Sequence, residues 1–282
     1  MRNECKSKYG SKLRLLISNT NQDIYKNPLE TSGFFITMTI ENITIFWIII
    51  GIISFPFLIK ITAPYGRHSS KNWGLTINNK IGWIIMEFPA LLVCPFIFFI
   101  NNPSLYSFNS FFILLWIIHY FNRTLIYPFK IKTKGKKMPL IIAFSAFGFN
   151  FINGVINGYF LSITNYYEFN IGMFLGFISF FAGLCINIWA DNKLISLRSK
   201  SQPGEYVIPK GGLFNYVSCP NFFGEVLEWF GFAIMTWNLG SLSFFIWTFI
   251  NLVPRALSHH NWYKEKFKKY PQKRKAIIPK II

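Results

Sequence analysis

Charged residues are scarce in this chain, and acidic residues are the scarcest. Only 14% of the 282 residues are charged, with 11 Asp and Glu against 29 Lys and Arg, whereas a soluble domain carries about 25%. The four cysteines form no CxxC pair and show no metal-ligand spacing, so they are interpreted as reduced packing residues and no metal site is expected. The chain also lacks a GxGxxG motif, which argues against the usual strand-turn-helix dinucleotide fold.

Apolar residues make up 52% of the sequence, and the mean hydropathy is +0.33. They lie in long blocks rather than in stripes, and each block is near the ~20 residues that a helix needs to cross ~30 Å of hydrocarbon. The blocks are residues 43–61, 81–100, 108–129, 138–163, 171–191, 221–238 and 241–257. The sequence therefore predicts an all-α, polytopic membrane protein with about seven transmembrane helices, six being the alternative.

Lysine and arginine are absent from three long segments, residues 81–122, 138–192 and 211–254. A soluble core has no reason to sort cations in this way, whereas membrane proteins retain them in cytosolic connections. The cations cluster in alternate connections and in the tail, at Lys60, Arg67, Lys71 and Lys80, at Lys130, Lys132, Lys134, Lys136 and Lys137, at Lys193, Arg198, Lys200 and Lys210, and from Lys264 to Lys280. We therefore expect these regions and the C-terminus to face the cytosol, with an odd number of spans.

The amino-terminal segment opposes this topology, because its own cations would also prefer the cytosol. They are Arg2, Lys6, Lys8, Lys12, Arg14 and Lys26. Either residues 1–33 form a poorly ordered basic extension, which is the interpretation adopted, or the first span is misplaced; the segment lacks the features of a secretory signal. The net charge of +18 is explained by topology and by attraction to anionic lipid headgroups, so no nucleic-acid partner is expected.

A few ionisable residues interrupt the apolar blocks, where each costs several kcal/mol unless it faces a cavity or a partner. They are Glu87, His119, Arg123, Asp191, Glu225 and Glu228. Helical spacing places Glu225 and Glu228 on one face with Asn221.

Arg255, His259 and Tyr263 are spaced by four and share a face at the end of the last block. If this face meets the one that carries Asn221, the two form either a polar chamber for a large, multiply charged cofactor or a buried ion-pair network that holds helices together. The sequence leaves both alternatives open.

The segment HYFNRTLIY places Tyr120, Arg123, Thr124 and Tyr127 on adjacent turns of one helical face. An intramembrane tyrosine usually anchors or packs, but one beside an arginine can also donate a proton to a carbonyl. Glu87, if buried in apolar surroundings, stays protonated at neutral pH and is then a hydrogen-bond donor too.

Seven segments resemble, in order, motifs of the steroid 5-alpha-reductase family, and especially of its plant brassinosteroid-pathway branch. They cover about the last 220 residues: APYGRH from Ala63, WIIMEFPAL from Trp83, HYFNRTLIYP from His119, NGVINGY from Asn153, INIWAD from Ile186, GEYVIPKGGLFNYVSCPNFFGEVLEW from Gly204, and PRALSHHNWYKEKFKKYPQKRKAIIP from Pro254. The resemblance implies a membrane domain over residues 34–282, a cofactor-binding portion at about 180–282, and residence in the endoplasmic reticulum.

The resemblance also implies the reaction, an NADPH-dependent reduction of the 4,5 double bond of a 3-oxo-4-ene steroid or sterol to the 5-alpha-3-oxo product. By motif position, Glu87 and Tyr120 match the pair that holds the steroid 3-oxo group, with Met86 beside them. The matches to cofactor-binding positions, or to positions close to them, are Arg123, Tyr127, Asn187, Asp191, Arg198, Tyr206, Asn221, Glu225, Arg255, His259 and Tyr263.

Two departures bear on specificity. Met86 stands where the animal steroid-hormone enzymes have glutamine, which puts animal hormones in doubt as substrates. Val207 stands where a basic residue often follows the tyrosine, so recognition of the cofactor's 2'-phosphate is expected to depend on Arg198 and neighbouring lysines. Alternative functions are reduction of trans-2-enoyl-CoA or of polyprenols by the same superfamily fold, and lipid binding without catalysis.

Overall fold

The computed structural model describes residues 28–282 except 65, 69–72, 102, 134, 167, 203 and 204. The chain divides into two compact units, Met1–Ile43 and Thr44–Ile282, and all candidate site residues belong to the second. Residues 1–33 were expected to be poorly ordered. Of these, residues 1–27 lie outside the described part of the chain, and helix α2 begins at Pro28.

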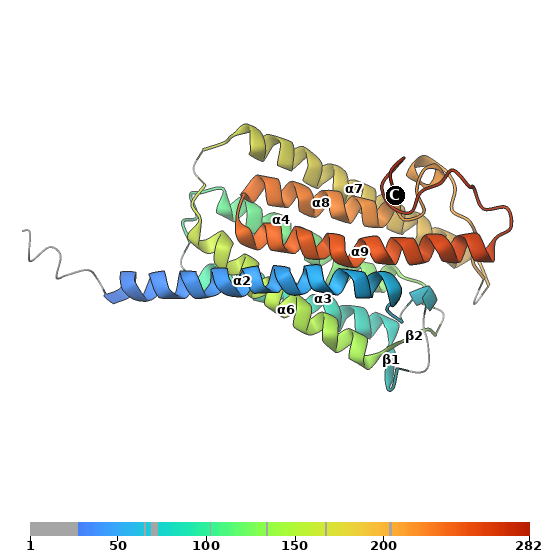
Figure 1. Ribbon diagram of the computed structural model, residues 1–282, viewed down its shortest axis with the longest axis horizontal. Helices are drawn as coiled ribbons and strands as arrows, with labels where there is room; N and C mark the ends of the chain where they lie inside the picture. The colour runs from blue at the N-terminus through green and yellow to red at the C-terminus, as the bar shows by residue number, and fades with distance from the viewer. Residues whose placement is uncertain are drawn as a thin grey trace, which may run out of the picture. The chain divides into compact units, whose positions relative to one another are not determined.

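The described chain is mainly helical (Figure 1). Its α-helices are α2 (Pro28–Lys60), α3 (Asn79–Ile100), α4 (Asn109–Phe121), α5 (Tyr127–Lys130), α6 (Leu140–Ile163), α7 (Ile171–Lys200), α8 (Pro220–Thr236) and α9 (Leu239–Lys266). Shorter elements are the 3-10 helices η1 (Gly66–His68) and η3 (Gly212–Asn215), the π-helical segment η2 (Asn122–Ile126), and the strands β1 (Thr76–Asn78) and β2 (Lys137–Pro139).

Among the residues that the structure describes, six helical segments are long and apolar enough to cross a membrane. They are Thr39–Lys60, Asn79–Ile100, Asn109–Lys130, Leu140–Ile163, Ile171–Lys200 and Leu239–Lys266. Helix α8 has 17 residues, so at 1.5 Å per residue it is about 25 Å long. Its two ends connect to opposite ends of the bundle. The predicted all-α polytopic fold is confirmed, with six candidate spans beside the shorter α8 against the predicted number of about seven, or alternatively six.

Hydrogen bonds between connections define these two ends. At one end Lys136 donates to Tyr206 and Arg274 donates to the Pro209 carbonyl oxygen. This end, called the cationic end below, carries residues 61–78, 131–139, 201–219 and 267–282, with β1, β2 and the C-terminus at the right of Figure 1. At the other end Tyr166 donates to the Thr236 carbonyl oxygen. The connections predicted from their cations to lie on one side thus meet in space.

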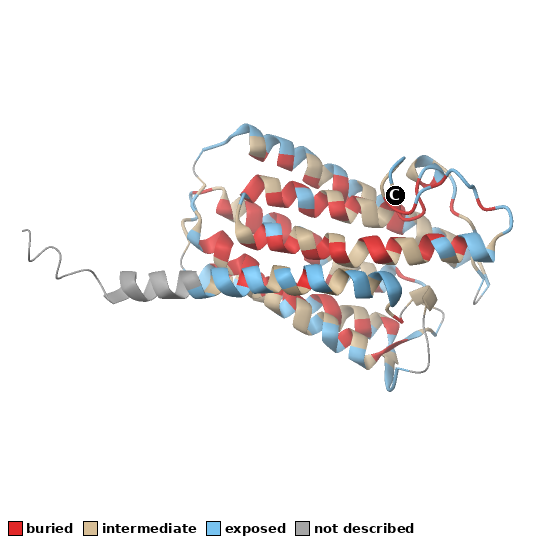
Figure 2. Ribbon diagram, in the orientation of Figure 1, coloured by how far each residue is buried: buried red, intermediate tan, exposed pale blue. Residues whose placement is uncertain are grey.

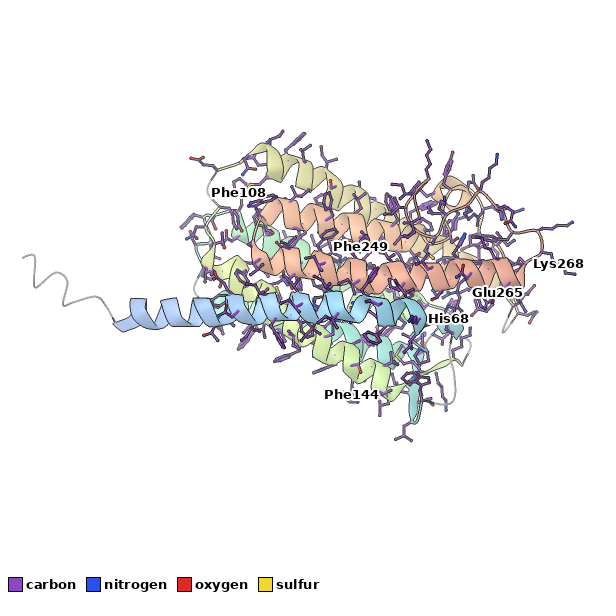
Figure 3. All side chains as sticks on the ribbon, viewed as in Figure 1. His68, Phe108, Phe144, Phe249, Glu265 and Lys268 are labelled. Carbon is purple, nitrogen blue, oxygen red and sulfur yellow. The ribbon has the colours of Figure 1, made fainter. Side chains whose placement is uncertain are left out.

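Figure 3 marks the same two ends with side chains: Phe108 lies at one, and His68, Glu265 and Lys268 lie at the other. Helices α7 and α9 extend beyond the apolar blocks that predicted them, to Lys200 and Lys266. Hydrophobicity marks only the lipid-embedded part of a helix, and neither helix meets a proline or glycine between the end of its apolar block and its polar end. The extensions supply walls of a pocket at the cationic end.

The bundle core is aromatic, and its outer faces are apolar. Trp116, Trp229, Phe180 and Phe232 have at most 1% of their surface exposed. Helix α2 instead carries exposed apolar side chains along its described length, in pale blue in Figure 2. An extended exposed apolar surface is what a lipid-facing helix requires.

Glycines let helices α7 and α8 approach at backbone distance. A Cβ atom placed on Gly183 would lie 2.3 Å from the backbone nitrogen of Glu228, and one on Gly176 would lie 2.6 Å from the carbonyl oxygen of Gly231. Gly224 approaches Gly183 in the same way from the side of α8. Small residues of this kind allow close packing of membrane helices.

A π-helical turn separates α4 from α5. Pro128 lacks the N–H that would bond to the carbonyl four residues earlier, and just before it the N–H of Tyr127 bonds to the carbonyl of Asn122, five residues back. The wider turn changes the direction in which the side chains of Arg123 and Tyr127 leave the helix. Such π-bulges are frequent at functional sites.

Candidate active site

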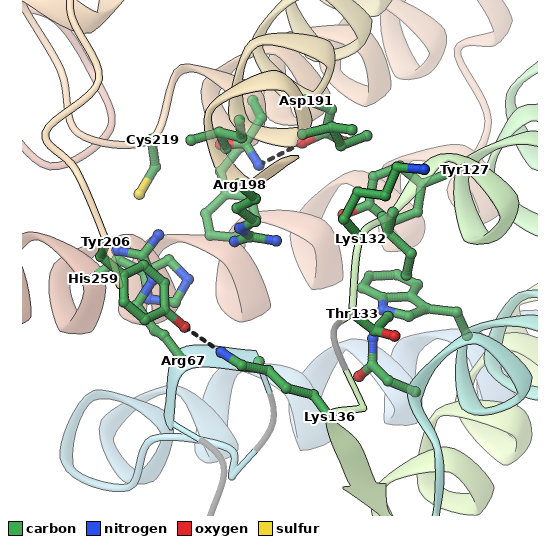
Figure 4. Close-up of a pocket in the computed structure, with 18 of the residues that line it drawn as sticks. Arg67, Tyr127, Lys132, Thr133, Lys136, Asp191, Arg198, Tyr206, Cys219 and His259 are labelled. Carbon is green, nitrogen blue, oxygen red and sulfur yellow. Dashed lines mark hydrogen bonds between the residues drawn. The ribbon is translucent and has the colours of Figure 1, made fainter. Parts of the chain in front are cut away.

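A pocket opens at the cationic end between the ends of α3, α7, α8 and α9, the η2–α5 segment and the nearby connections (Figure 4). Nine of the residues predicted from the sequence line it: Arg123, Tyr127, Asp191, Arg198, Tyr206, Asn221, Glu225, Arg255 and His259. Their places in the chain are up to 136 residues apart, from 123 to 259, so the fold gathers them from five elements and a connection.

A continuous polar network forms the inner wall of this pocket. The Arg123 guanidinium lies 3.6 Å from the Asp191 carboxylate, which accepts a hydrogen bond from Asn221 at 3.0 Å. Asn187 donates to the Asn221 carbonyl oxygen at 3.0 Å and to the Glu225 carboxylate at 3.3 Å. Arg255 and His259 of α9 line the same pocket. The two predicted faces therefore meet around a polar chamber, and this network forms its inner wall.

Glu87 extends the network into the bundle. Its Oε1 accepts from Arg123 at 3.3 Å, and its Oε2 accepts from Asn150 of α6 at 3.4 Å. Asn150 also donates to the Met86 carbonyl oxygen at 2.6 Å, and Glu87 is 8% exposed. Arg123 thus connects the pocket with a buried carboxyl group one layer deeper.

Tyr120 lies in the aromatic core. Its ring is 4.9 Å from that of Trp116 and 6.0 Å from that of Trp229, and the residue is 3% exposed. Helix α4, which carries Tyr120, continues into the π-helical segment that carries Arg123, and Arg123 contacts the Glu87 carboxylate. Arg123 therefore links the helix of Tyr120 to the buried carboxyl group.

Glu228 does not join Asn221 and Glu225 at the pocket, although helical spacing placed all three on one face. Its Oε1 lies 2.8 Å from His119 Nδ1, and the two residues are 0% and 2% exposed. The close approach of α7 and α8 turns Glu228 toward α4 instead. Its Oε2 is buried and has no hydrogen-bond partner among the described residues.

Three other predicted site residues lie behind the pocket wall rather than in it. Asn187 holds Asn221 and Glu225, as described above. Tyr263 accepts a hydrogen bond from Arg67 at 3.3 Å and lines a smaller adjoining hollow. Met86 is buried against Met138.

Arg67 lies at the mouth of the pocket. The sequence had indicated only that it belongs to a cationic connection. Its guanidinium lies over the rings of Tyr263 and Trp262 at 4.5 and 5.0 Å and over that of Tyr206 at 5.6 Å. Its Nη1 is buried and has no hydrogen-bond partner in the described part of the chain. The sequence signal was its place in APYGRH, but that motif alone gave no role.

His68 docks the same connection onto α9. Its Nε2 lies 2.8 Å from His259 Nδ1, and the two rings stack at 4.9 Å. Burial lowers the pKa of His68 to about 4, with smaller contributions from the charges of Arg255 and Arg67. At neutral pH this imidazole is therefore uncharged and can share a single proton with His259.

The other groups missed by the sequence reasoning are an amide, an aromatic ring and two lysines. Asn150 was missed because the search of the apolar blocks considered only ionisable side chains. Trp83, Lys132 and Lys136 line the pocket, and the Arg123 guanidinium lies 4.7 Å from the Trp83 ring.

The described cysteines are free, namely Cys94, Cys185 and Cys219. Burial raises the pKa of Cys219, at the pocket wall, to about 12, which keeps its thiol protonated. Within the described residues no group of His, Cys, Asp and Glu is arranged to hold a metal ion.

Comparison with known proteins gives a consistent result. The family described as 3-oxo-5-alpha-steroid 4-dehydrogenase matches residues 136–282. The steroid 5-alpha-reductase DET2 of Solanum lycopersicum is 42% identical over 249 residues, covering 84% of this chain and 95% of that protein. The 3-oxo-5-alpha-steroid 4-dehydrogenase 1 of Homo sapiens is 37% identical over 226 residues, covering 78% and 86%. The chain therefore belongs to the steroid 5-alpha-reductase (3-oxo-5-alpha-steroid 4-dehydrogenase) family of oxidoreductases.

Proposed function

We propose that this protein uses NADPH to reduce the 4,5 double bond of a 3-oxo-4-ene steroid or sterol. The observation that supports the proposal is that Glu87 and Tyr120 are both buried in the bundle, with Glu87 joined through Arg123 to a polar pocket. The relatives' names refer to the same reaction on steroids. A plant-type sterol is the favoured substrate class, because Met86 departs from the animal hormone enzymes.

The pocket has the chemistry that a phosphorylated dinucleotide requires. Six cations line it, against three carboxylates: Arg67, Arg123, Lys132, Lys136, Arg198 and Arg255 against Asp191, Glu205 and Glu225. Arginine and lysine bind phosphate oxygens with charge-assisted hydrogen bonds. The buried, unpartnered Nη1 of Arg67 is a donor that such a ligand would satisfy, so the residues fit NADPH.

NADPH, when bound, supplies the hydride for saturation of the enone. The protein's own residues hold the substrate and stabilise its changing charge. As the double bond is reduced, negative charge develops on the steroid 3-oxygen, and hydrogen bonds from Tyr120 and Glu87 to that oxygen would strengthen. One such preorganised donor contributes ~3 kcal/mol to transition-state stabilisation.

The surroundings of the pair determine how well it donates. Burial disfavours a charged Glu87 carboxylate, whereas the adjacent Arg123 guanidinium favours one, so the protonated state of Glu87 stays a prediction. The Tyr120 ring is held among Trp116, Trp229 and Phe244. This aromatic cage excludes water and fixes the direction of the phenol.

The family and the charge distribution support a proposal for the topology and the location. We propose that the cationic end faces the cytosol, where the cofactor is available, and that the membrane is that of the endoplasmic reticulum. A tag on the C-terminus should then be accessible to antibody after selective permeabilisation of the plasma membrane. Detection only after full solubilisation would contradict this orientation.

The activity is tested with microsomes that contain the protein, incubated with NADPH and a panel of 3-oxo-4-ene sterols, with mass spectrometry of the products. Tyr120→Phe and Glu87→Gln should lower turnover by about a hundredfold and leave NADPH binding intact. Tyr106→Phe and Glu265→Gln are matched controls, because both residues are exposed, and they should retain full turnover.

Two outcomes would contradict the proposal. Full turnover by Glu87→Gln would remove its role as a donor to the 3-oxygen. Reduction of a trans-2-enoyl-CoA, or of a polyprenol, without reduction of any 4-en-3-one would replace the steroid substrate with an alternative substrate of the superfamily.

A further inference from the structure

Lys136 lies at the mouth of the pocket, next to the ring of Tyr206, which was predicted to bind the cofactor. Its ammonium group is 4.8 Å from the centre of the Tyr206 ring and hydrogen-bonds to the Tyr206 hydroxyl at 2.5 Å. Figure 4 shows this contact as a dashed line, with Arg67 close to Tyr206. The two residues are 70 positions apart in the chain, so no local sequence pattern could have paired them.

The backbone around Lys136 fixes this position. Its N–H donates to the Thr133 carbonyl oxygen in a tight turn, and its carbonyl accepts from Asn79 at 3.3 Å. Gly135, with φ of +78°, allows the turn. The side chain therefore starts from an anchored point beside the β1–β2 pair and does not depend on a long free loop.

The residue after Tyr206 supplies no charge to this part of the site. Val207 is 39% exposed and lines the adjoining hollow together with Arg67, Arg198 and Tyr206. Position 207 is where the resemblance leads us to expect a basic side chain. Lys136 supplies a cation that contacts the ring of the neighbouring Tyr206.

The charge distribution indicates which part of a dinucleotide lies here. The inner wall contains Asp191 and Glu225, which repel phosphate, and it leads to Glu87 and Tyr120, where the reduction must occur. Phosphates are therefore favoured at the mouth. Among the described residues that line the pocket, the third carboxylate is that of Glu205, which accepts a hydrogen bond from the Gln202 backbone N–H at 2.9 Å.

Building on the proposed function, we propose that Lys136, together with Arg198, binds the 2'-phosphate of NADPH and sets the preference for NADPH over NADH. The Tyr206 hydroxyl uses one of the three donors of the ammonium group, which leaves two for phosphate oxygens. A neighbouring cation is the usual means of accommodating this phosphate. Here the cation comes from the connection between α5 and α6, outside the portion at about 180–282 predicted to bind the cofactor.

The competing interpretation is purely structural, with Lys136 serving only to fasten its connection to Tyr206. Binding of the two oxidised dinucleotides separates the two roles, because NADP⁺ and NAD⁺ differ only in the 2'-phosphate. The purified full-length protein in detergent would be titrated with each by calorimetry, and the thermal midpoint of the unliganded protein recorded alongside.

Lys136→Gln should weaken NADP⁺ binding by about tenfold or more and change NAD⁺ binding by less than about twofold. Lys136→Arg should restore most of the NADP⁺ affinity. Lys130→Gln is the matched control, since it removes the same charge from an exposed residue nearby that does not line the pocket, and it should leave both affinities unchanged.

Retention of the wild-type ratio of NADP⁺ to NAD⁺ affinity by Lys136→Gln would overturn the inference, whether or not the thermal midpoint falls. An equal loss of both affinities would overturn it too, because that pattern indicates a structural role. If the unmodified protein itself shows no preference for NADP⁺, the cofactor assigned under the proposed function fails first.

Discussion

Gly183→Ala tests whether the close contact of α7 and α8 holds the polar wall of the pocket. An added Cβ would lie 2.3 Å from the Glu228 backbone nitrogen and 2.5 Å from the Gly224 carbonyl oxygen. Moving from 2.3 Å to the 3.4 Å of an ordinary van der Waals contact requires about 1.1 Å of separation. The obstacles are backbone atoms, so no side chain can rotate away to relieve the clash.

A separation of α7 and α8 by that distance would also change the contacts one helical turn away, at the wall of the pocket. Asn187 of α7 donates to the Asn221 carbonyl oxygen of α8 at 3.0 Å, and a further 1.1 Å would break this hydrogen bond. Over-packing of this kind costs about 1–3 kcal/mol. We therefore expect Gly183→Ala to lower both the thermal midpoint and the affinity for NADP⁺.

The assay combines thermal denaturation of the purified protein, followed by tryptophan fluorescence, with NADP⁺ titration. Gly148→Ala is the control, because Gly148 lies within α6 and an added Cβ there meets no atom within 4 Å. Alanine has a helix propensity about 1 kcal/mol better than glycine, so this control should be neutral or slightly stabilising. Equal stability and equal NADP⁺ affinity for the two variants would refute the close packing.

Three further changes probe individual contacts. Asn221→Ala, which removes the hydrogen bond to Asp191, should lower the affinity for NADP⁺ by about tenfold in the same titration. Arg255→Ala should lower it by a similar factor, and an unchanged affinity would remove the substituted residue from the cofactor site. His119→Ala leaves the buried Glu228 carboxyl group without its hydrogen-bond partner and should cost about 1–3 kcal/mol. The double variant with Glu228→Gln should cost less than the sum of the single changes, and additive costs in this double-mutant cycle would show that the pair is not coupled. His68 has a pKa of about 4 in the folded protein against an ordinary 6.5, so between these pH values the unfolded chain binds more protons than the folded protein. The stability contribution of neutral His68 is therefore complete above pH 6.5 and is lost as the pH falls toward 4. Thermal midpoints of His68→Gln should vary less with pH over this window than those of the unmodified protein, and parallel curves would contradict the assignment.

The membrane fold could be predicted because its main determinant is local. A span needs about 20 consecutive apolar residues, which composition along the chain reveals directly, and the cations at Lys60 and Lys130 mark the boundaries. Hydrophobicity along the chain predicted less about the parts of the helices that lie outside the apolar blocks. The ends of α7 and α9 lie in polar sequence, and the π-helical turn before Pro128 needs backbone geometry that composition does not encode.

The candidate site was predicted residue by residue only as far as its motifs extended. Resemblance identified the nine pocket residues without indicating what each one touches. The contact between His119 and Glu228 joins positions 109 residues apart, and helical spacing alone had placed Glu228 with the pocket. Lys136 was missed for the same reason, since a lysine in a cationic connection looks like a topology signal until the fold places it on Tyr206.

Arg123 is the point at which the two halves of the site depend on each other. Its guanidinium lies 3.3 Å from Glu87 of α3 and 3.6 Å from Asp191 of α7, and it also lines the pocket. When a guanidinium that is shared between two carboxylates moves toward one of them, it stabilises the ionised form of the other less. Ligand contacts that draw Arg123 outward, toward Asp191, would therefore weaken the interaction of the guanidinium with Glu87 and favour the protonated, hydrogen-bond-donating form of that carboxyl group. Occupation of the outer pocket would in this way prepare the inner carboxyl group for a carbonyl oxygen, through one side chain and without any movement of the helices.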